Sequence, residues 1–297
     1  MGRAADLDIF PVLTSSTRKD LQKVLKPSSH YFDHMIACMF DEDGERICAD
    51  PTQAYSKLEL APQLFGAISL PIAQSIEPQL VNLDEQAIGW EIRLQRDVTL
   101  EADESISVRD VRRYFGPGAA FDRVQILALS RADRDAWIKH EYRESHGNSS
   151  APNFTFRSLA DPITPFEIEF STNSPGGFRL AAGELYRFDP WLNRYARSMI
   201  STNQHHPYVL LGFRYTAEET FAHCCGDIVF AGPDLDFKSR YGSLRRSSSI
   251  LDGKLTVVTV FELPTTVIPA EELPQLESFT LQAIKETTQW ISWRSHE

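Results

Sequence analysis

The residues from Tyr241 to Leu263 constrain the fold of this chain most strongly. Two alternating runs, Tyr241 to Leu251 and Lys254 to Leu263, are separated only by Asp252-Gly253. Asp-Gly is typical of a two-residue type I′ turn, because both central positions of that turn need positive φ. Pro264 ends the second run, since proline cannot donate a hydrogen bond within a strand ladder. The stretch therefore predicts a β-hairpin.

A second pair of strands is predicted from Ala87 to Phe115, with a turn at Glu101 to Glu104. Apolar and charged residues alternate there, which favours an antiparallel ribbon with one face in solvent. Further short strands are expected at Phe154–Leu159, Pro165–Thr172, Phe178–Phe188, Val209–Tyr215, Thr220–His223 and Asp227–Phe230.

Two regions have the apolar spacing of helices. The first is Ala119 to Glu144, with a break expected near Ser130, and the second runs from about Pro269 to Trp293. Proline followed by two glutamates suits the start of the second helix. The predicted fold class is therefore α+β, mostly antiparallel β, with a central and a C-terminal helix.

The stretch from Tyr31 to Thr52 holds the candidate chemistry. An apolar run begins at His34, an acidic turn follows, and a second run ends at Asp50. This pattern predicts a hairpin, which would return Asp50 to the side of His34. An imidazole whose ring N–H is held by a carboxylate is the base and its orienting partner in a catalytic triad. The alternative is a histidine that serves only the structure.

The same stretch resembles a known family. Phe32-Asp33-His34, a strand, an acidic turn, Asp50-Pro51-Thr52 and then Tyr55 to Leu70 are similar to the second half of the catalytic core of bacterial transglutaminase-like proteins. In the multi-domain members a β-rich domain precedes this cysteine-protease-like core and another follows it. The resemblance implies that His34 is the catalytic histidine and Asp50 the catalytic aspartate. It continues to about Ser278, with motif-level similarity from His34 to Thr52.

In that family a strand similar to Ala5–Ser16 follows the helix that carries the catalytic cysteine, so the resemblance implies that this helix would lie before Met1. The chain is then expected to be a C-terminal fragment or a pseudoenzyme, inactive in acyl transfer by itself. With the helix supplied by another chain, the reaction would be Cys-His-Asp amide hydrolysis or transfer. The alternative is a non-catalytic β-sandwich module that binds a partner.

The four cysteines give no obvious nucleophile. Cys38 is four residues from His34 on one predicted strand, about 13 Å away at a rise of ~3.3 Å per residue, which is too far for proton transfer. Cys38 and Cys48 could face each other across the hairpin, although buried free thiols are expected. Cys224 and Cys225 lie in another predicted β region. None forms a C-x-x-C pair, so neither zinc nor a thioredoxin-like site is indicated.

Length and charge set further limits. A chain of 297 residues is long enough for two domains or one large one. We expect a partial transglutaminase-like core over 1–75, a β-ribbon and helix region over 76–150, and a β-sandwich-like domain with a C-terminal helix over 151–297. The formal charge of −11 argues against nucleic acid as a partner. The one basic cluster, Arg109 to Arg113, is expected on the solvated face of a strand.

No cofactor and no metal is predicted. His205-His206 would point in opposite directions on an extended chain, and Asp234-Leu235-Asp236 offers too few oxygens for calcium. Gly116-Pro117-Gly118 lacks the lysine of a phosphate-binding loop. The expected partner is a protein or peptide substrate, or an upstream chain that supplies the missing helix.

The sequence contains no run of the ~18 apolar residues that a membrane span needs, and no signal peptide follows Met1. A soluble chain is expected, with the cytoplasm as the default compartment, although transglutaminase-like relatives often carry an export signal.

Overall fold

The structure is a computed structural model of the 297-residue chain. It describes residues 8–16, 29–52, 60–61, 64, 67–72, 81–82, 89–146, 153–173, 178–181, 184–187, 192, 195, 208–286 and 288–295. The fold is α+β, with mostly antiparallel strands and few helices, as the sequence predicts.

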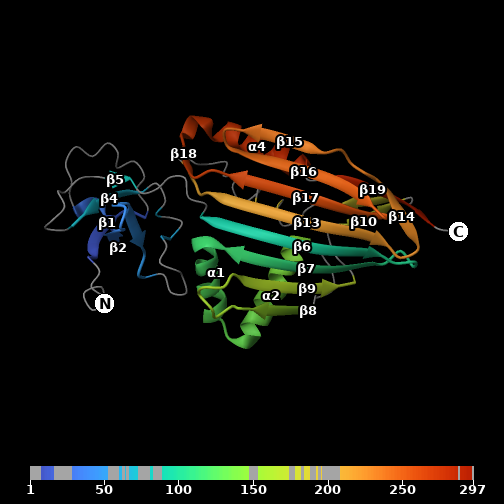
Figure 1. The fold of residues 1–297 in the computed structure, drawn as a ribbon, viewed down its shortest axis with the longest axis horizontal. Helices are drawn as coiled ribbons and strands as arrows, with labels where there is room; N and C mark the ends of the chain where they lie inside the picture. Colours follow the sequence, from blue (N-terminus) through green and yellow to red (C-terminus); the bar gives the residue numbers. More distant parts are fainter. Residues whose placement is uncertain are drawn as a thin grey trace.

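A five-stranded antiparallel sheet is formed near the N-terminus, and Figure 1 draws it beside one end of a much longer sheet. The short 3-10 helix η3 (Ser29–Tyr31) precedes its second strand. One face of this sheet packs Val12, Ile36 and Cys38 against Leu64 and Ala67. In the order β3-β2-β1-β4-β5 the strands are β3 (Arg46–Ala49), β2 (His34–Phe40), β1 (Phe10–Thr14), β4 (Ile68–Pro71) and β5 (Val81–Asn82).

The long sheet has twelve described strands and includes segments from both sides of residue 150. Its main path runs β10-β11-β19-β14-β13-β6-β7-β9-β8, and β17, β16 and β15 continue from β13. A separate two-stranded sheet pairs β12 (Tyr208–Leu210) with β18 (Thr266–Ile268). The strands of the long sheet are β6 (Trp90–Leu100), β7 (Ile106–Phe115), β8 (Asn153–Arg157), β9 (Phe166–Thr172), β10 (Phe178–Ala181), β11 (Glu184–Arg187), β13 (Phe213–His223), β14 (Gly226–Ala231), β15 (Leu235–Ser239), β16 (Gly242–Leu251), β17 (Lys254–Leu263) and β19 (Gln289–Ser295).

Helices and a second layer of strands cover one face of the long sheet. Apolar residues of α1 (Gly116–Ala128) and α2 (Arg131–His146) pack on β7, β8 and β9. The helix α4 (Leu273–Glu286), which follows the 3-10 turn η5 (Ala270–Glu272), packs on β6, β13 and β17. Side chains of β11, β14 and β19 pack over the far ends of β6, β13 and β17. The inward positions alternate with polar ones along each strand, because side chains of a strand point to opposite faces in turn.

A row of buried charge crosses the covered face. The guanidinium of Arg96 binds both carboxylate oxygens of Asp110 at 2.6 and 2.7 Å, and it also reaches Glu219 at 3.2 Å. Arg187 of β11 contacts Glu219 from the facing layer. The row follows from the strand register, which sets Arg96 opposite Asp110 in β7 and opposite Glu219 in β13.

Several predicted elements are confirmed. The hairpin of β16 and β17 turns at Asp252 and Gly253 with φ of 50° and 69°, as a type I′ turn requires. The ribbon of β6 and β7 is present with one polar face. The central helical region breaks where expected, because the side chain of Ser130 accepts the N–H of Asp133 at the start of α2.

The predicted last helix is wrong at its end. It stops at Glu286, and residues 289–295 form the strand β19 instead. These residues pair with β11 and β14, and burial alternates along the strand, with Ile291 fully buried and Trp290 46% exposed. Two smaller corrections concern Phe178–Phe188, which contains the two strands β10 and β11, and Thr220–His223, which is the end of the longer β13.

The basic cluster in β7 is only partly solvated, which corrects the prediction. Arg109 and Arg113 pair with Glu169 and Glu167 on the outer face. Asp110 and Arg112 lie on the covered face, because they alternate with the other two along the strand. The sequence therefore carries solvated and buried charge within five consecutive residues.

Some predictions fall on residues that the structure does not describe. These are the connector from Thr17 to Leu25, the loop at Gly147–Pro152 and the histidine pair His205-His206. Much of Tyr55–Leu70 and of the polar stretch Ile76–Asp84 is also outside the described residues, although Val81–Asn82 forms β5. Among the described helices none is long and apolar enough to cross a membrane.

Candidate functional site

The hairpin of β2 and β3 sets the geometry of the candidate site. Its antiparallel register places Cys38 directly opposite Cys48, and Ala37 opposite Ala49. Residues two apart on a strand share a face, so His34 lies on the face of Cys38, and Asp50 lies on the face of Cys48. Asp50 follows β3 directly and becomes a diagonal cross-strand neighbour of His34.

The imidazole of His34 and the carboxylate of Asp50 are in hydrogen-bond contact. His34 Nε2 lies 3.0 Å from Asp50 Oδ2. The Asp50 side chain is 3% exposed, whereas that of His34 is 25% exposed. An ionised carboxylate only accepts hydrogen bonds, so Nε2 donates and the lone pair of the neutral ring is on Nδ1. No hydrogen bond to Nδ1 is found within the described part of the chain, which leaves this nitrogen able to accept a proton.

Thr52 fixes the carboxylate from its other side. Its backbone N–H and its hydroxyl both donate to Asp50 Oδ1, at 3.0 and 2.7 Å. Such a turn, in which an aspartate accepts the N–H two residues ahead, is a local device that needs only the short side chain. The spacing of Asp50-Pro51-Thr52 thus has a physical reason. The role of Thr52 was not predicted from the sequence, although the turn motif is a usable indication.

A second local contact holds the start of β2. The carboxylate of Asp33 accepts the N–H and the hydroxyl of Ser16 at 2.8 and 3.1 Å. The backbone N–H of Asp33 donates to the carbonyl of Thr14 at 3.2 Å, and Thr14 lies opposite His34 in the register of β1 and β2. The backbone that carries the imidazole is therefore tied to the end of β1.

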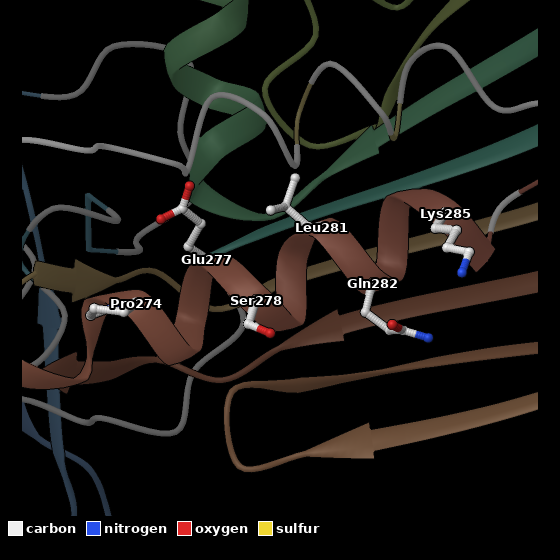
Figure 2. Close-up of a pocket in the computed structure, with 6 residues that line it drawn as sticks. All are labelled: Pro274, Glu277, Ser278, Leu281, Gln282 and Lys285. Carbon is white, nitrogen blue, oxygen red and sulfur yellow. The ribbon is translucent and has the colours of Figure 1, made fainter.

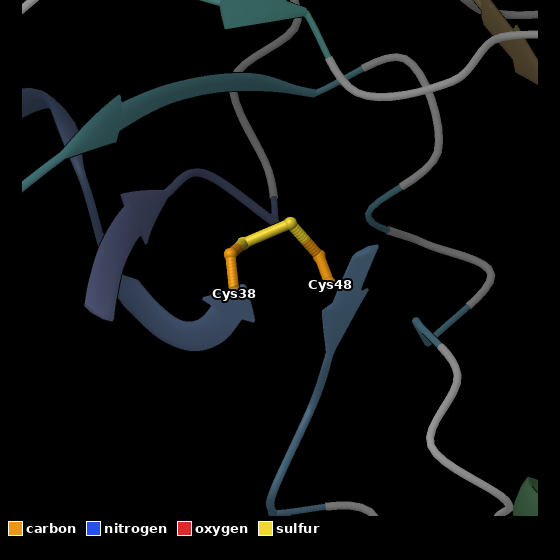
Figure 3. Close-up of a disulfide and its surroundings, with 2 residues drawn as sticks. All are labelled: Cys38 and Cys48. Carbon is orange, nitrogen blue, oxygen red and sulfur yellow. A yellow bond between two sulfur atoms is a disulfide. The ribbon is translucent and has the colours of Figure 1, made fainter. Parts of the chain in front are cut away.

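Cys38 and Cys48 form a disulfide, which overturns the expectation of free thiols (Figure 3). The two residues are directly opposite each other on one face of the hairpin, with Cα atoms 4.1 Å apart, so the sulfurs meet across the strands. The bond covalently fixes the register that sets Asp50 beside His34. It also removes both sulfurs as nucleophiles, because a disulfide sulfur is not a thiolate.

The other two cysteines are far from the pair. Cys224 and Cys225 form the turn between β13 and β14. In Figure 1 this turn is at the end of the long sheet opposite to the five-stranded sheet. None of the four cysteines of the sequence is therefore placed as a thiol beside His34.

The described residues contain an open depression, which lies away from the candidate pair. No group of three or more histidine, cysteine or acidic side chains there could hold a metal ion. A shallow, open depression runs along one helix, α4, as Figure 2 shows. It contains neither His34 nor Asp50, so it is unrelated to the candidate pair. Its residues are Pro274, Glu277, Ser278, Leu281, Gln282 and Lys285.

No protein-family model matches the chain. No curated protein matches it either. Among solved structures there is a weak similarity, with a TM-score of 0.47 and 11% sequence identity, to a protein from Parabacteroides distasonis ATCC 8503 that is described as a candidate protease. The alignment covers 98% of this chain and 41% of that protein, so the chain spans about two fifths of its length.

Proposed function

We propose that His34 and Asp50 are the base and the orienting partner of a transglutaminase-like or peptidase-like acyl-transfer site that lacks its own nucleophile. The observation that carries the proposal is the 3.0 Å contact between His34 Nε2 and Asp50 Oδ2. The two threonine hydrogen bonds to the other carboxylate oxygen support it, because they hold Asp50 in the orientation that His34 needs. The sequence resemblance around His34 supports the same assignment.

In such a site Nδ1 of His34 would take the proton of an incoming thiol, and Asp50 would stabilise the imidazolium that forms. The thiolate would then attack an amide carbonyl. Because Cys38 and Cys48 are bonded to each other and Cys224 and Cys225 lie in the turn between β13 and β14, we propose that the chain alone does not form an acyl-enzyme. The nucleophile would come from another polypeptide segment, and the substrate would be a protein or peptide amide.

A small external thiol can stand in for the missing cysteine. We expect the wild-type chain to accelerate the reaction of a small monothiol with an activated aryl ester, and the variants His34→Ala and Asp50→Asn to lose this acceleration. His140→Ala is the matched control, because His140 is an exposed histidine on α2. Mass analysis after the assay has to find the Cys38–Cys48 bond intact. Equal rates for the wild type and His34→Ala would reject the proposal.

The second candidate function is a non-catalytic binding module. It is favoured by the apolar outer face of the five-stranded sheet, where Met35, Ile47 and Ile72 are 56%, 45% and 47% exposed. This face is opposite to the one that carries His34. If the chain only binds a partner through this face, Met35→Lys should weaken binding and His34→Ala should leave it unchanged. If His34 and Asp50 are a catalytic pair, His34→Ala should abolish the acceleration of the monothiol reaction. If the chain is only a binding module, His34→Ala should not affect that reaction.

A further inference from the structure

The turn between β13 and β14 carries two adjacent thiols that the proposed function does not use. Cys224 and Cys225 are the two turn residues between His223 and Gly226, which pair with each other. Both cysteines are exposed. Their Sγ atoms are 2.8 Å apart. The tip of this hairpin therefore presents two sulfur nucleophiles side by side.

The backbone of the turn is held on both sides. The N–H of Cys224 donates to the carbonyl of Leu100 at 2.9 Å, and the N–H of Cys225 donates to Nδ1 of His223 at 3.1 Å. The ring of His223 in turn stacks on Trp293 of β19, with centroids 5.4 Å apart. A disulfide bond is ~2.0 Å long, so the two sulfurs need to approach by less than about 1 Å to bond. The fold thus keeps the thiols close to bonding distance.

A disulfide between these residues would differ from the one in the candidate site. The Cys38–Cys48 bond joins two strands, and Cys38 is 1% exposed. A bond between neighbouring residues closes a small ring that contains a peptide bond, and the preference of that bond for planarity strains the ring. Strained and exposed disulfides are the more easily reduced ones. A Cys224–Cys225 bond would therefore be reduced more easily than the Cys38–Cys48 bond.

We propose that Cys224 and Cys225 form a redox-active vicinal dithiol that exchanges with small disulfides. One thiol loses its proton, and the thiolate attacks a sulfur of the small disulfide, whose S–S bond breaks to give a mixed disulfide and one small thiol. The second cysteine then loses its proton and attacks the mixed disulfide, which forms the Cys224–Cys225 bond and releases the second small thiol. The dithiol is oxidised by two electrons, the small disulfide is reduced to two thiols, and the two protons leave on these thiols.

The electrostatics of the turn fit this order of steps. The hydrogen bond with Cys225, followed by partial desolvation and by the nearby charges of Cys225 and Glu101, raises the pKa of Cys224 to about 11. A thiol with a raised pKa is less often a thiolate, so Cys224 is the sulfur that keeps its proton until the mixed disulfide has formed.

Oxidised glutathione is a suitable probe for the full-length protein. Intact-mass analysis should find that the wild type loses two hydrogen atoms and retains no glutathione. Cys224→Ser and Cys225→Ser should each retain one glutathione, because the second step is blocked. Peptide mapping has to locate the new bond at Cys224–Cys225, with Cys38–Cys48 unchanged. Stable glutathione on both sulfurs of the wild type, a covalent dimer, or no reaction would each overturn the proposal.

A second measurement separates a labile pair from an inert one. The protein is equilibrated with mixtures of reduced and oxidised glutathione. The Cys224–Cys225 disulfide should be half reduced at a lower proportion of reduced glutathione than the Cys38–Cys48 disulfide. The double variant Cys224→Ser with Cys225→Ser is the control that removes the first transition and leaves the second. A common midpoint for both pairs would contradict the assignment.

Discussion

Glu218 and Glu219 are neighbours in β13, yet their carboxylates lie on opposite faces of the long sheet. Glu219 is fully buried and is contacted by the guanidinium groups of Arg96 and Arg187, whereas Glu218 is exposed on the outer face. Successive side chains of a strand point to opposite faces of the sheet. One glutamate therefore joins a buried ion-pair network, and its neighbour lies in solvent.

This arrangement predicts that a change from glutamate to glutamine lowers the free energy of unfolding much more at Glu219 than at Glu218. Glu219→Gln removes a buried charge that pairs with two arginines, and loss of one partner of a buried ion pair costs about 3–5 kcal/mol. Glu218→Gln should change the free energy of unfolding by less than about 0.5 kcal/mol. Urea denaturation measures both. Equal effects would mean that the network contributes nothing specific to stability.

Thr52→Val should destabilise the five-stranded sheet. The variant keeps the shape of the side chain and the backbone N–H bond but removes the hydroxyl that donates to Asp50 at 2.7 Å. A buried carboxylate that loses a donor costs about 1–3 kcal/mol. The control is Thr155→Val, an exposed position on β8, for which no change is expected. Thermal unfolding compares the two, and a neutral Thr52→Val would show that the turn N–H alone holds Asp50.

Removal of the hairpin disulfide should lower stability by an amount set by the length of the closed loop. For a sequence separation of 10, loop entropy gives about 2–3 kcal/mol. The double variant of Cys38 and Cys48 to serine is compared with the same double change at Cys224 and Cys225, which should be close to neutral. Alkylation of Cys38 and Cys48 in the untreated protein would instead support the free thiols expected from the sequence.

Two glycines in the left-handed region allow a matched comparison. Gly44 has φ +80°, and a Cβ added there would meet open space. Gly253 has φ +69°, and a Cβ added there would overlap the carboxylate of Asp227. Gly44→Ala should cost about 1–2 kcal/mol from backbone strain alone. Gly253→Ala should cost more, because Asp227 also has to move. The free energies of unfolding of both variants test this order.

The thiol pair predicts a dependence on pH. Since the hydrogen bond with Cys225 is the largest cause of the raised pKa of Cys224, about 11, Cys225→Ala should lower the pKa of Cys224. The rate of alkylation of Cys224, followed by peptide mapping across pH, should rise in the wild type with a midpoint near pH 11. In the variant this step should lie at lower pH. An unchanged high step in the variant would assign the shift to desolvation and Glu101 instead.

Local patterns in the sequence predict much of this fold. Asp252-Gly253 predicts a hairpin because only a few residue pairs adopt its turn, and the alternation around Trp90 to Leu94 predicts a strand with one covered face. The hairpin at His34 follows from similar signals and brings Asp50 next to the imidazole. The catalytic role of this pair stays a prediction, because neither geometry nor the comparisons test it.

Features that depend on distant partners could not be predicted in this way. The parallel pairing of β6 with β13 joins residues 123 positions apart, as between Arg96 and Glu219, and no local signal indicates it. Asp110 is buried on the covered face of β7, where it binds Arg96, so the prediction of a solvated charge cluster was wrong for this residue. The last strand, β19, was predicted as part of a helix because Ile284 and Ile291 fit one apolar stripe, and its pairing with the distant strands β11 and β14 decides its conformation.

The parallel pairing of β6 with β13 has a consequence for biosynthesis. On the ribosome, the β6–β7 ribbon is complete long before β13 is translated, and β17 follows later still. Until then the outer edge of β6 presents a row of backbone N–H and C=O groups that other nascent chains can pair with. The centre of the finished sheet is thus an open edge during synthesis, and products of translation that stop before residue 213 should depend on chaperones to remain unaggregated.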